Sequence, residues 1–244
     1  MKLVTVQSTS VKAVFEVLKE IINDVNVYFT DKGVSIVTLD TARTSLIDLH
    51  LAADNFEEYE CPEPIIAGIN VMNTFKLLKS IGNSDILTMS ITSKEHMDIE
   101  ILSEAKKQKS RFQLKLLDID EHEIEVPELK CSCMTTMQSV DFQRICRDMG
   151  NIGSDIAIAR HKNIMTLTCE GDFANQETSI ETIENVEDSV SGVYSLKYLN
   201  IFTKATGMCA SVQLMQESAF LILQYNVANL GHLKFYLATK ATEV

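Results

Sequence analysis

Six carboxylates stand close together near the middle of the chain, and they are the side chains that could most readily do chemistry. They are Asp118, Asp120, Glu121, Glu123, Glu125 and Glu128. Paired carboxylates can hydrolyse glycosidic bonds, and acidic clusters can hold two metal ions. Here Ile119, Ile124 and Val126 interrupt the run. A solvated acidic segment with a few aliphatic side chains is the better interpretation, and an enzyme that uses Asp118 or Asp120 is the alternative.

The other chemical signals in the sequence are weak. Cys131 and Cys133 would share one face of a strand, but no second Cys/His pair stands at metal-ligand spacing. The six cysteines are typical of reduced thiols in an intracellular protein. The sequence contains no Walker-type phosphate loop, no GxSxG and no HExxH. We therefore expect no metal, no cofactor and no catalytic activity.

The basic residues are few but segregated. The formal net charge is −12, which taken alone argues against a nucleic-acid binder, because phosphate contacts need Lys or Arg. Four segments with helical spacing each carry two basic residues three or seven positions apart, and therefore on one face. The pairs are Lys12 and Lys19, Lys76 and Lys79, Arg144 and Arg147, and Lys197 and Lys204.

These four segments hold eight basic and five acidic residues, a net charge of +3. The remaining 14 basic and 29 acidic residues sum to −15. A solvated face is the ordinary interpretation of any one such helix. Recurrence in all four favours a shared basic surface, which would contact phosphates without reading base sequence.

The elements that must position these residues follow from hydrophobic periodicity. Apolar residues recur at helical spacing in residues 10–24, 70–81, 141–150 and 195–205, with Ser10 as an N-cap and Gly150 as a helix end. Most other segments alternate like half-buried antiparallel strands. These are 25–39 (a hairpin that turns at 31–33), 45–51, 86–91, 97–102, 112–116, 156–159, 164–168, 179–183, 211–215, 220–225 and 232–237.

The order of elements occurs twice, which predicts an internal duplication in an α+β protein. Phe15 of the first helix corresponds to Phe142, and Leu77 of the second to Phe202. The predicted domains are residues 1–116 and 132–244, joined by a connector at 117–131 that contains the acidic run. No apolar run approaches the roughly 18 residues of a membrane span, so we expect no membrane partner.

Several motifs resemble one known family. They are L114-K-L-L-D-I-D120, D141-F-Q-R-I-C-R-D148, S195-L-K-Y-L-N-I-F-T-K-A-T206, L230-G-H-L-K-F-Y-L-A238, G68-I-N70 and L78-K-S-I-G-N-S-D85. Together, and in their order along the chain, they are similar to proliferating cell nuclear antigen, the eukaryotic-type DNA sliding clamp. The resemblance covers nearly the whole chain.

The resemblance implies a closed ring of three identical subunits whose two domains each place two helices around the hole and sheets outside. It implies a non-enzymatic processivity factor that encircles duplex DNA, docks a DNA polymerase and other proteins with a clamp-binding peptide, and is opened by an ATP-dependent clamp loader. It also implies a nuclear location, or a viral replication compartment if the gene is viral.

The resemblance further implies site residues. The eight basic residues named above would face DNA, although Ala13 stands where the family has a further lysine. A partner-peptide pocket would be formed by Leu39, Arg43, Leu46, Ile124, Val126, Phe220, Tyr236, Ala238 and Thr239. Arg43 replaces a usual histidine, and Phe220 and Thr239 replace prolines, so we expect an altered pocket and altered partner peptides. Phe112 would lie at the subunit joint, where a strand near 107–115 meets one near 174–182 of the next subunit.

Two further alternatives share this architecture. A checkpoint-type clamp subunit would join two different chains, and a homotrimer in solution would argue against it. A viral-type monomeric clamp would hold DNA by charge alone, which the acidic composition disfavours.

Overall fold

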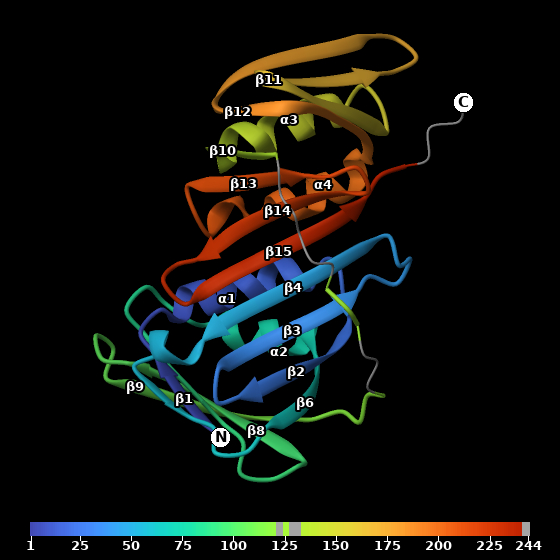
Figure 1. The fold of residues 1–244 in the computed structure, drawn as a ribbon. Coiled ribbons are helices and arrows are strands. Elements are labelled where there is room, and N and C mark those ends of the chain that lie inside the picture. Colours follow the sequence, from blue (N-terminus) through green and yellow to red (C-terminus); the bar gives the residue numbers. More distant parts are fainter. Residues whose placement is uncertain (121–123, 127–132, 241–244) are drawn as a thin grey trace. The chain divides into compact units, whose positions relative to one another are not determined.

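The computed structural model describes residues 1–120, 124–126 and 133–240, and it describes the side chains in these ranges except those of 185–188. The chain divides into two compact units. The first comprises residues 1–38, 47–125 and 226–233, and the second comprises residues 39–46, 126–225 and 234–244. Figure 1 shows the elements of both in sequence colours. No helix within the described residues is long and apolar enough to cross a bilayer.

The first unit contains two sheets and two helices (Figure 1). Its elements are β1 (Lys2–Thr5), α1 (Ser8–Leu18), β2 (Asp24–Thr30), β3 (Gly33–Leu39), β4 (Ser45–Ala52), a 3-10 turn (Ala53–Asn55), β5 (Glu58–Glu60), β6 (Ile65–Asn70), α2 (Val71–Leu78), β7 (Ile86–Ser90), β8 (His96–Ser103) and β9 (Gln108–Lys115). One sheet has the strand order β5-β1-β7-β8-β9, and the other contains β4-β3-β2-β6. The pairs β1–β5, β1–β7, β7–β8, β8–β9, β2–β3 and β2–β6 are all antiparallel.

The core of the first unit lies where α1 meets the inner faces of both sheets. A 30 Å³ apolar cavity marks this point, lined by Val14 and Phe15 of α1, Met89 of β7 and Phe29 of β2, among others. The lining offers no polar partner to a water molecule, so this small cavity is apolar. The apolar faces of α1 and of both sheets therefore meet in one core layer.

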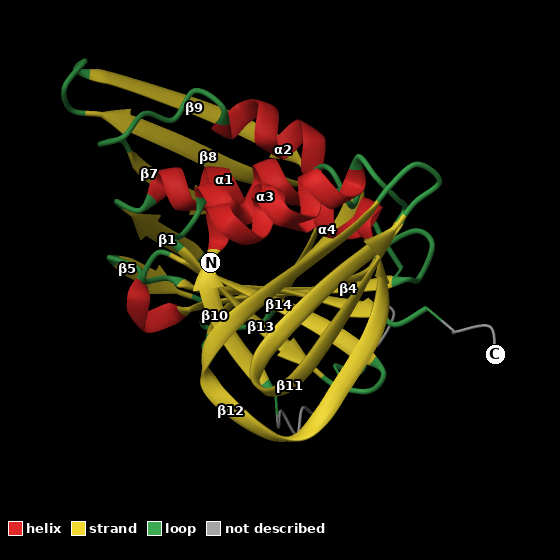
Figure 2. Ribbon diagram, turned by 90° about the horizontal axis from the view of Figure 1, so that it is seen from above, coloured by secondary structure: helices red, strands yellow, loops and turns green. Residues whose placement is uncertain are grey.

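The second unit has the same plan. Its elements are β10 (Met134–Gln138), α3 (Ser139–Gly150), β11 (Asp155–Glu170), β12 (Asn175–Ser195), α4 (Leu196–Phe202), a 3-10 turn (Thr203–Gly207), β13 (Ser211–Gln216), β14 (Phe220–Val227) and β15 (Gly231–Ala238). The strands run in the order β10-β13-β14-β15, and β11 pairs with β12 in a separate ribbon. Figure 2 shows α3 and α4 packed against each other, as α1 and α2 are in the first unit.

Aromatic stacking fixes α4 on the sheet of the second unit. Phe202, 0% exposed, stacks on Phe235 of β15 with ring centroids 4.5 Å apart and an interplanar angle of 5°. Tyr225 of β14 meets the same Phe235 ring edge-on at 6.3 Å. Burying three rings in one cluster gives a large apolar contribution together with defined geometry.

The structure confirms the two-fold α+β plan and corrects several details. Phe15 and Phe142 are both buried, as the duplication requires, and Phe202 is fully buried whereas Leu77, its predicted counterpart, is half-buried. Ser10 lies inside α1, which begins at Ser8 after Gln7. Gly150 is the last residue of α3 and does not adopt a left-handed conformation.

The strands at 156–159 and 164–168 form one strand, β11, and the partner β12 extends well beyond 179–183. The predicted break falls at a register irregularity around Arg160 and Lys162. Arg160 is 1% exposed, and its guanidinium bonds to Thr182 and to the backbone oxygen of Glu184 on β12. A buried, partnered arginine keeps the ribbon continuous where a charged residue would usually mark a loop.

The turn of the first hairpin requires a glycine. Gly33 has a φ of 135°, and a Cβ there would lie 2.0 Å from the Leu51 backbone oxygen. Asp31 and Lys32 form the turn itself, and Gly33 begins β3.

Removing the stacked ring of α4 should weaken the second unit. We expect Phe202→Ala to lower the free energy of unfolding by roughly 3–5 kcal/mol, because it leaves a cavity against Phe235. Val140→Ala, at a residue 55% exposed, should change it by less than about 0.5 kcal/mol. Urea unfolding followed by circular dichroism measures both, and equal effects would contradict the proposed role of the stack.

Candidate nucleic-acid interface and docking surface

The basic residues of α1 and α2 differ in how far they are available to a ligand. Lys12 Nζ donates to the Ile81 backbone oxygen at 2.7 Å, just past the end of α2. Lys19 contacts Glu20 and lies over the Phe75 ring, 5.1 Å from its centroid. Lys76 is exposed and reaches Asn73 Oδ1 only at 3.4 Å, and Lys79 is exposed. Lys76 and Lys79 are therefore exposed to solvent, whereas Lys12 and Lys19 are engaged by neighbouring groups.

The beginning of α2 is defined by a side-chain cap. Asn70 Oδ1 accepts a hydrogen bond from Asn73 N at 2.9 Å, and Asn70 Nδ2 donates to Asp24 Oδ1 at 2.7 Å. The cap satisfies an N–H group that the helix cannot satisfy itself. The cap fixes where α2 begins, and thereby the face of the helix on which Lys76 and Lys79 lie.

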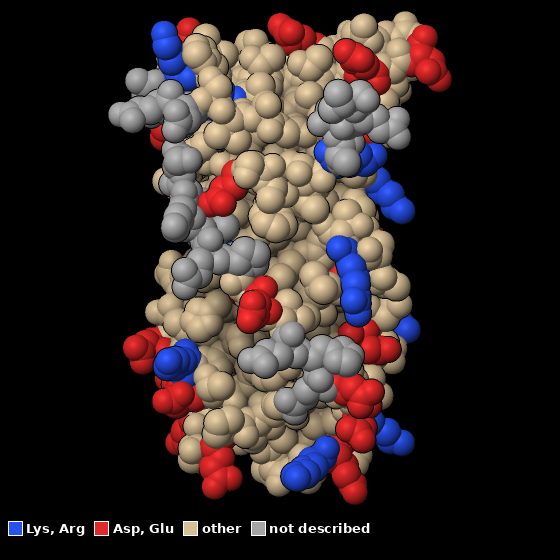
Figure 3. Space-filling model, turned by 45° about the vertical axis from the view of Figure 1, so that its right-hand side comes forward, with Lys and Arg blue, Asp and Glu red and all other residues tan. Residues whose placement is uncertain are grey.

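In the second unit the cations of α3 carry local counter-charges. Arg144 lies 3.3 Å from Asp141, and Arg147 lies 3.8 Å from Asp148. All four side chains keep about half or more of their surface exposed, so these pairs are weak and can exchange for a phosphate. Lys197 on α4 and Lys204 on the following turn are also exposed. Figure 3 shows acidic and basic side chains interspersed on one face of the molecule.

A buried carboxylate organises the segment that carries Leu39, Arg43 and Leu46. Asp40, 7% exposed, accepts hydrogen bonds from the backbone N–H groups of Ala42, Thr44 and Ser45 at 3.1, 2.7 and 2.6 Å. Tyr198 of α4 donates to the same carboxylate at 2.7 Å. Burial by itself would raise the pKa of Asp40, but these hydrogen bonds outweigh it and hold the pKa below its ordinary value.

Asp40 holds Arg43 in a strained conformation. Arg43 has a φ of 54°, which is uncommon for a residue with a Cβ. Its exposed side chain is thereby directed from a turn whose backbone is tied down on both sides. The turn and the buried Asp40 therefore determine where the Arg43 side chain leaves the backbone.

A backbone bond joins this turn to the end of β15, and further bonds join Thr239, which follows β15, to Ala219, which precedes β14. Ala238 N donates to the Thr44 oxygen at 3.3 Å. Thr239 donates to the Ala219 oxygen both from its backbone N at 3.0 Å and from Oγ1 at 3.3 Å, next to Phe220. A proline at position 239 could not make the backbone bond. Thr239 therefore ties this edge of the surface to Ala219 with a backbone hydrogen bond.

The apolar residues of the expected pocket fall into two groups by burial. Leu46 and Tyr236 are 7% and 3% exposed and can only form a floor. Leu39, Phe220 and Ala238 are half-buried. In the connector, Ile124 is half-buried and belongs to the first unit, whereas Val126 is 36% exposed and belongs to the second. Glu121, Glu123, Glu128 and Cys131 of the connector lie outside the described residues.

β9 and β12 are among the strands that have an edge with no strand beside it within the described residues; β5, β6 and β10 also end their sheets. β9 is the last strand of its sheet, and β12 pairs only with β11. Phe112 of β9 is half-buried opposite Ile99 of β8, which is fully buried, so its ring lies on the core side of this edge strand. Such edges invite pairing with another chain.

Sequence reasoning missed Asp40, Tyr198 and Glu100. Asp40 follows a predicted strand end, the usual place for an Asx turn, and this signal could have identified it. Nothing in the sequence links it to Tyr198, because the two are 158 residues apart. Glu100 gathers two cations of β9, which only the strand register reveals.

Comparison with known proteins identifies one family throughout the chain. The family model "Proliferating cell nuclear antigen, N-terminal domain" matches residues 1–124, and "Proliferating cell nuclear antigen, C-terminal domain" matches residues 125–240. The chain is also similar to a curated protein of Paramecium bursaria Chlorella virus 1, named "Probable DNA polymerase sliding clamp 1". The two are 38% identical over 247 aligned residues, which cover 96% of this chain and 94% of the viral protein.

Replacing the buried carboxylate should loosen the turn at 41–44. We expect Asp40→Asn to lower the free energy of unfolding at pH 7 by about 1–3 kcal/mol, because an amide accepts these N–H bonds less well. A carboxylate with a lowered folded-state pKa stabilises above its unfolded pKa, and this contribution disappears as pH falls through the folded pKa. The difference between wild type and variant should therefore shrink from pH 7 to pH 3. A constant difference in denaturant unfolding would contradict the role of the charge.

Proposed function

The chain belongs to the proliferating cell nuclear antigen family, and we propose that it acts as a DNA sliding clamp, a processivity factor for a DNA polymerase. The observation that carries this proposal is the match of both clamp domains over residues 1–240. Three copies form a closed ring through which duplex DNA passes. The duplex is retained because it is threaded, and it moves because no contact grips it tightly.

The charge distribution supports the DNA contact. The accessible cations are on α2, α3, α4 and the turn after α4, and they are of the kinds that touch phosphates rather than base edges. Lys12 and Lys19 are engaged by neighbouring groups and make a smaller contribution. A weakly basic lining gives salt-sensitive, mobile contacts. The acidic remainder of the chain repels DNA from other surfaces.

Partner proteins dock at the surface formed by the Asp40 turn, the end of β15 and the connector. A short helical turn of the partner places an aliphatic and aromatic side chains against Leu39, Ala238 and the floor beneath them. Carboxylates of the connector steer basic partner peptides. Arg43, Phe220 and Thr239 give this chain its own peptide preference.

The clamp itself catalyses no reaction. An ATP-dependent loader opens the ring and closes it around DNA, because the chain has no phosphate loop of its own. The protein works where DNA is replicated, in the nucleus or, for a viral gene, in the viral replication compartment. Similarity to a viral protein over nearly the whole chain supports the latter possibility.

The assembly is tested by absolute mass. Light scattering at micromolar concentration should give three times the 27.3 kDa of one chain. A single-chain mass would contradict the ring. A mixed assembly that forms only with a second, different chain would favour the checkpoint-type alternative.

The lining is tested by removing its most accessible lysines. We expect the combined change of Lys76, Lys79, Lys197 and Lys204 to alanine to weaken association with duplex DNA at low salt at least about tenfold, with a smaller salt dependence and an unchanged mass. The control replaces four exposed lysines outside these helices, Lys32, Lys94, Lys106 and Lys162. Anisotropy of a labelled duplex measures both, and equal losses would show that only net charge matters.

The docking surface is tested with a fluorescent clamp-binding peptide. We expect Leu39→Ala combined with Ile124→Ala to weaken binding at least about tenfold, because each change removes an apolar contact at the anchor. Val6→Ala, at a residue 53% exposed just before α1 and outside this surface, serves as the control. Binding that survives the double change would place the peptide elsewhere.

A further inference from the structure

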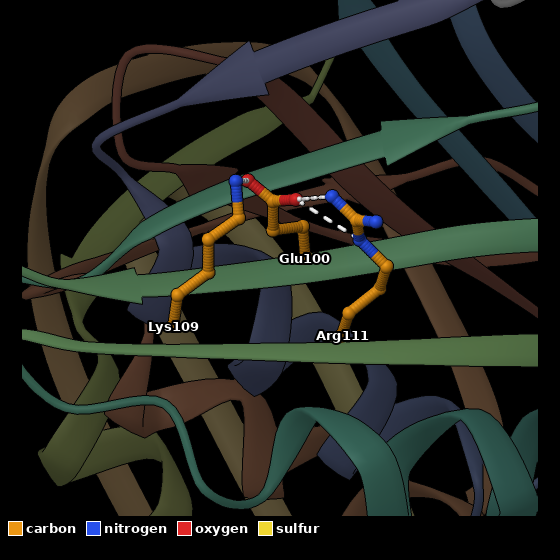
Figure 4. Close-up of polar contacts among 3 residues, drawn as sticks. All are labelled: Glu100, Lys109 and Arg111. Atoms are coloured by element: carbon orange, nitrogen blue, oxygen red, sulfur yellow. Dashed lines mark hydrogen bonds and ion pairs between the residues drawn. The ribbon is translucent and has the colours of Figure 1, made fainter.

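One carboxylate of β8 holds two cations of the edge strand β9 (Figure 4). Glu100 Oε1 lies 2.6 Å from Lys109 Nζ, and Glu100 Oε2 lies 3.0 Å from Arg111 Nη2. The bond from Lys109, followed by that from Arg111, lowers the pKa of Glu100. The Lys109 and Arg111 side chains nevertheless remain 53% and 68% exposed. Two cations share one carboxylate, so this part of the edge keeps a positive charge.

The whole outer face of β9 has the same sign. Lys109, Arg111 and Lys115 point away from the core, and the strand contains no acidic residue. Phe112 and Leu114 alternate with them on the core side, opposite Ile99 and Met97 of β8. Alternation therefore keeps the three cations on one face of the open edge.

The edge strand β12 carries the opposite charge. Residues 175–195 contain five carboxylates and no lysine or arginine. Glu177 and Glu181 are exposed and alternate with half-buried Thr178 and Ile180. Within the described residues neither forms an ion pair with a basic side chain. The facing segment 164–170 of β11 has only Glu170 as a charged residue, so the charge of this ribbon edge is concentrated on β12.

We propose that these two edges form a charge code by which the chain selects copies of itself when the ring assembles. The inference rests on the proposed clamp function and concerns which chains can be neighbours. In each joint Lys109 and Arg111 of one copy face Glu177 and Glu181 of the next, on the outer side of the sheet. Any register that keeps Phe112 on the core side keeps all four charges on that outer side.

Backbone bonding and side-chain charge have separate roles in this joint. Main-chain hydrogen bonds form between any two strand edges and cannot distinguish partners. The charges distinguish them, because two β9 edges or two β12 edges repel each other while β9 attracts β12. The same repulsion discourages closed pairs and aggregates built from like edges. Glu100 reduces the ordering cost, since it already holds Lys109 and Arg111 in place.

The test inverts each edge separately and then both together. Variant one carries Glu100→Lys, Lys109→Glu and Arg111→Glu, which inverts the cluster without leaving like charges beside residue 100. Variant two carries Glu177→Lys and Glu181→Lys. Sedimentation velocity across a concentration series, at about 50 mM and 1 M salt, measures the affinity of the trimer. Circular dichroism melts confirm that each variant is folded.

We expect each inverted edge alone to weaken the trimer at least about tenfold at low salt, with a smaller effect at high salt. The combined five-residue variant should recover most of the affinity. Control reversals of matched number, Lys32→Glu with Lys94→Glu and Asp54→Lys with Glu63→Lys, should leave it unchanged.

The possible failures are distinguishable. A wild-type trimer whose affinity is unaffected by either inversion, or whose folded five-residue variant fails to recover, overturns the charge code and leaves the clamp function intact. A wild-type chain that stays a single subunit overturns the clamp function, and the charge code with it.

Discussion

An acidic protein that retains DNA must do so with few cations. In this chain, eight of the 22 basic residues are on or next to the four helices. The formal net charge is −12, and Lys12 and Lys19 are already engaged by groups of the protein. The cations that remain are exposed and weakly paired, so each contributes little and is screened by salt. Affinity of this kind cannot hold a duplex for long. In the proposed function, retention comes from a closed path around the duplex.

Closure depends in turn on strand edges. Most of each unit satisfies its backbone bonds internally, through antiparallel ladders and the capped end at Asn70. β9 and β12 are among the strands whose outer edge has no strand beside it in the described chain, and they carry opposite charge. An exposed edge is a hazard unless it has a specific partner, and charge is the means by which a sheet edge can be made selective. If DNA is retained by a closed ring, as proposed, the edges of β9 and β12 must pair selectively to close it.

Hydrophobic periodicity predicted the helices and the duplication well, because burial follows directly from spacing. Phe142, Ile145, Cys146 and Met149 recur at helical intervals and all are buried in α3. Periodicity failed where a polar residue is buried with partners. Arg160 fell between the predicted strands at 156–159 and 164–168, yet it lies within β11 and bonds to Thr182 and Glu184 of β12. Such bonds depend on strand register, which local sequence does not encode.

The sequence predicted which residues form the candidate site, but it did not predict which of their side chains are exposed and which are engaged by other groups. Sequence spacing assigned all eight helical cations to one shared basic surface. Whether a lysine is available depends on a distant group, such as the Ile81 carbonyl that Lys12 reaches, 69 residues away. The same applies to the docking surface. Arg43 was noted as a substitution, but its left-handed conformation depends on Asp40, and Asp40 depends on Tyr198.

Whether the duplex is threaded rather than gripped can be measured without a loader. The purified chain is mixed with a linear duplex whose ends are free, and with the same duplex after both ends are blocked by bulky protein caps, and is then fixed by crosslinking. Threading predicts that the chain is recovered on the open duplex and largely lost from the capped one at equal salt. Equal recovery on both would mean that the chain binds DNA from the side, and the account of a closed ring would be wrong.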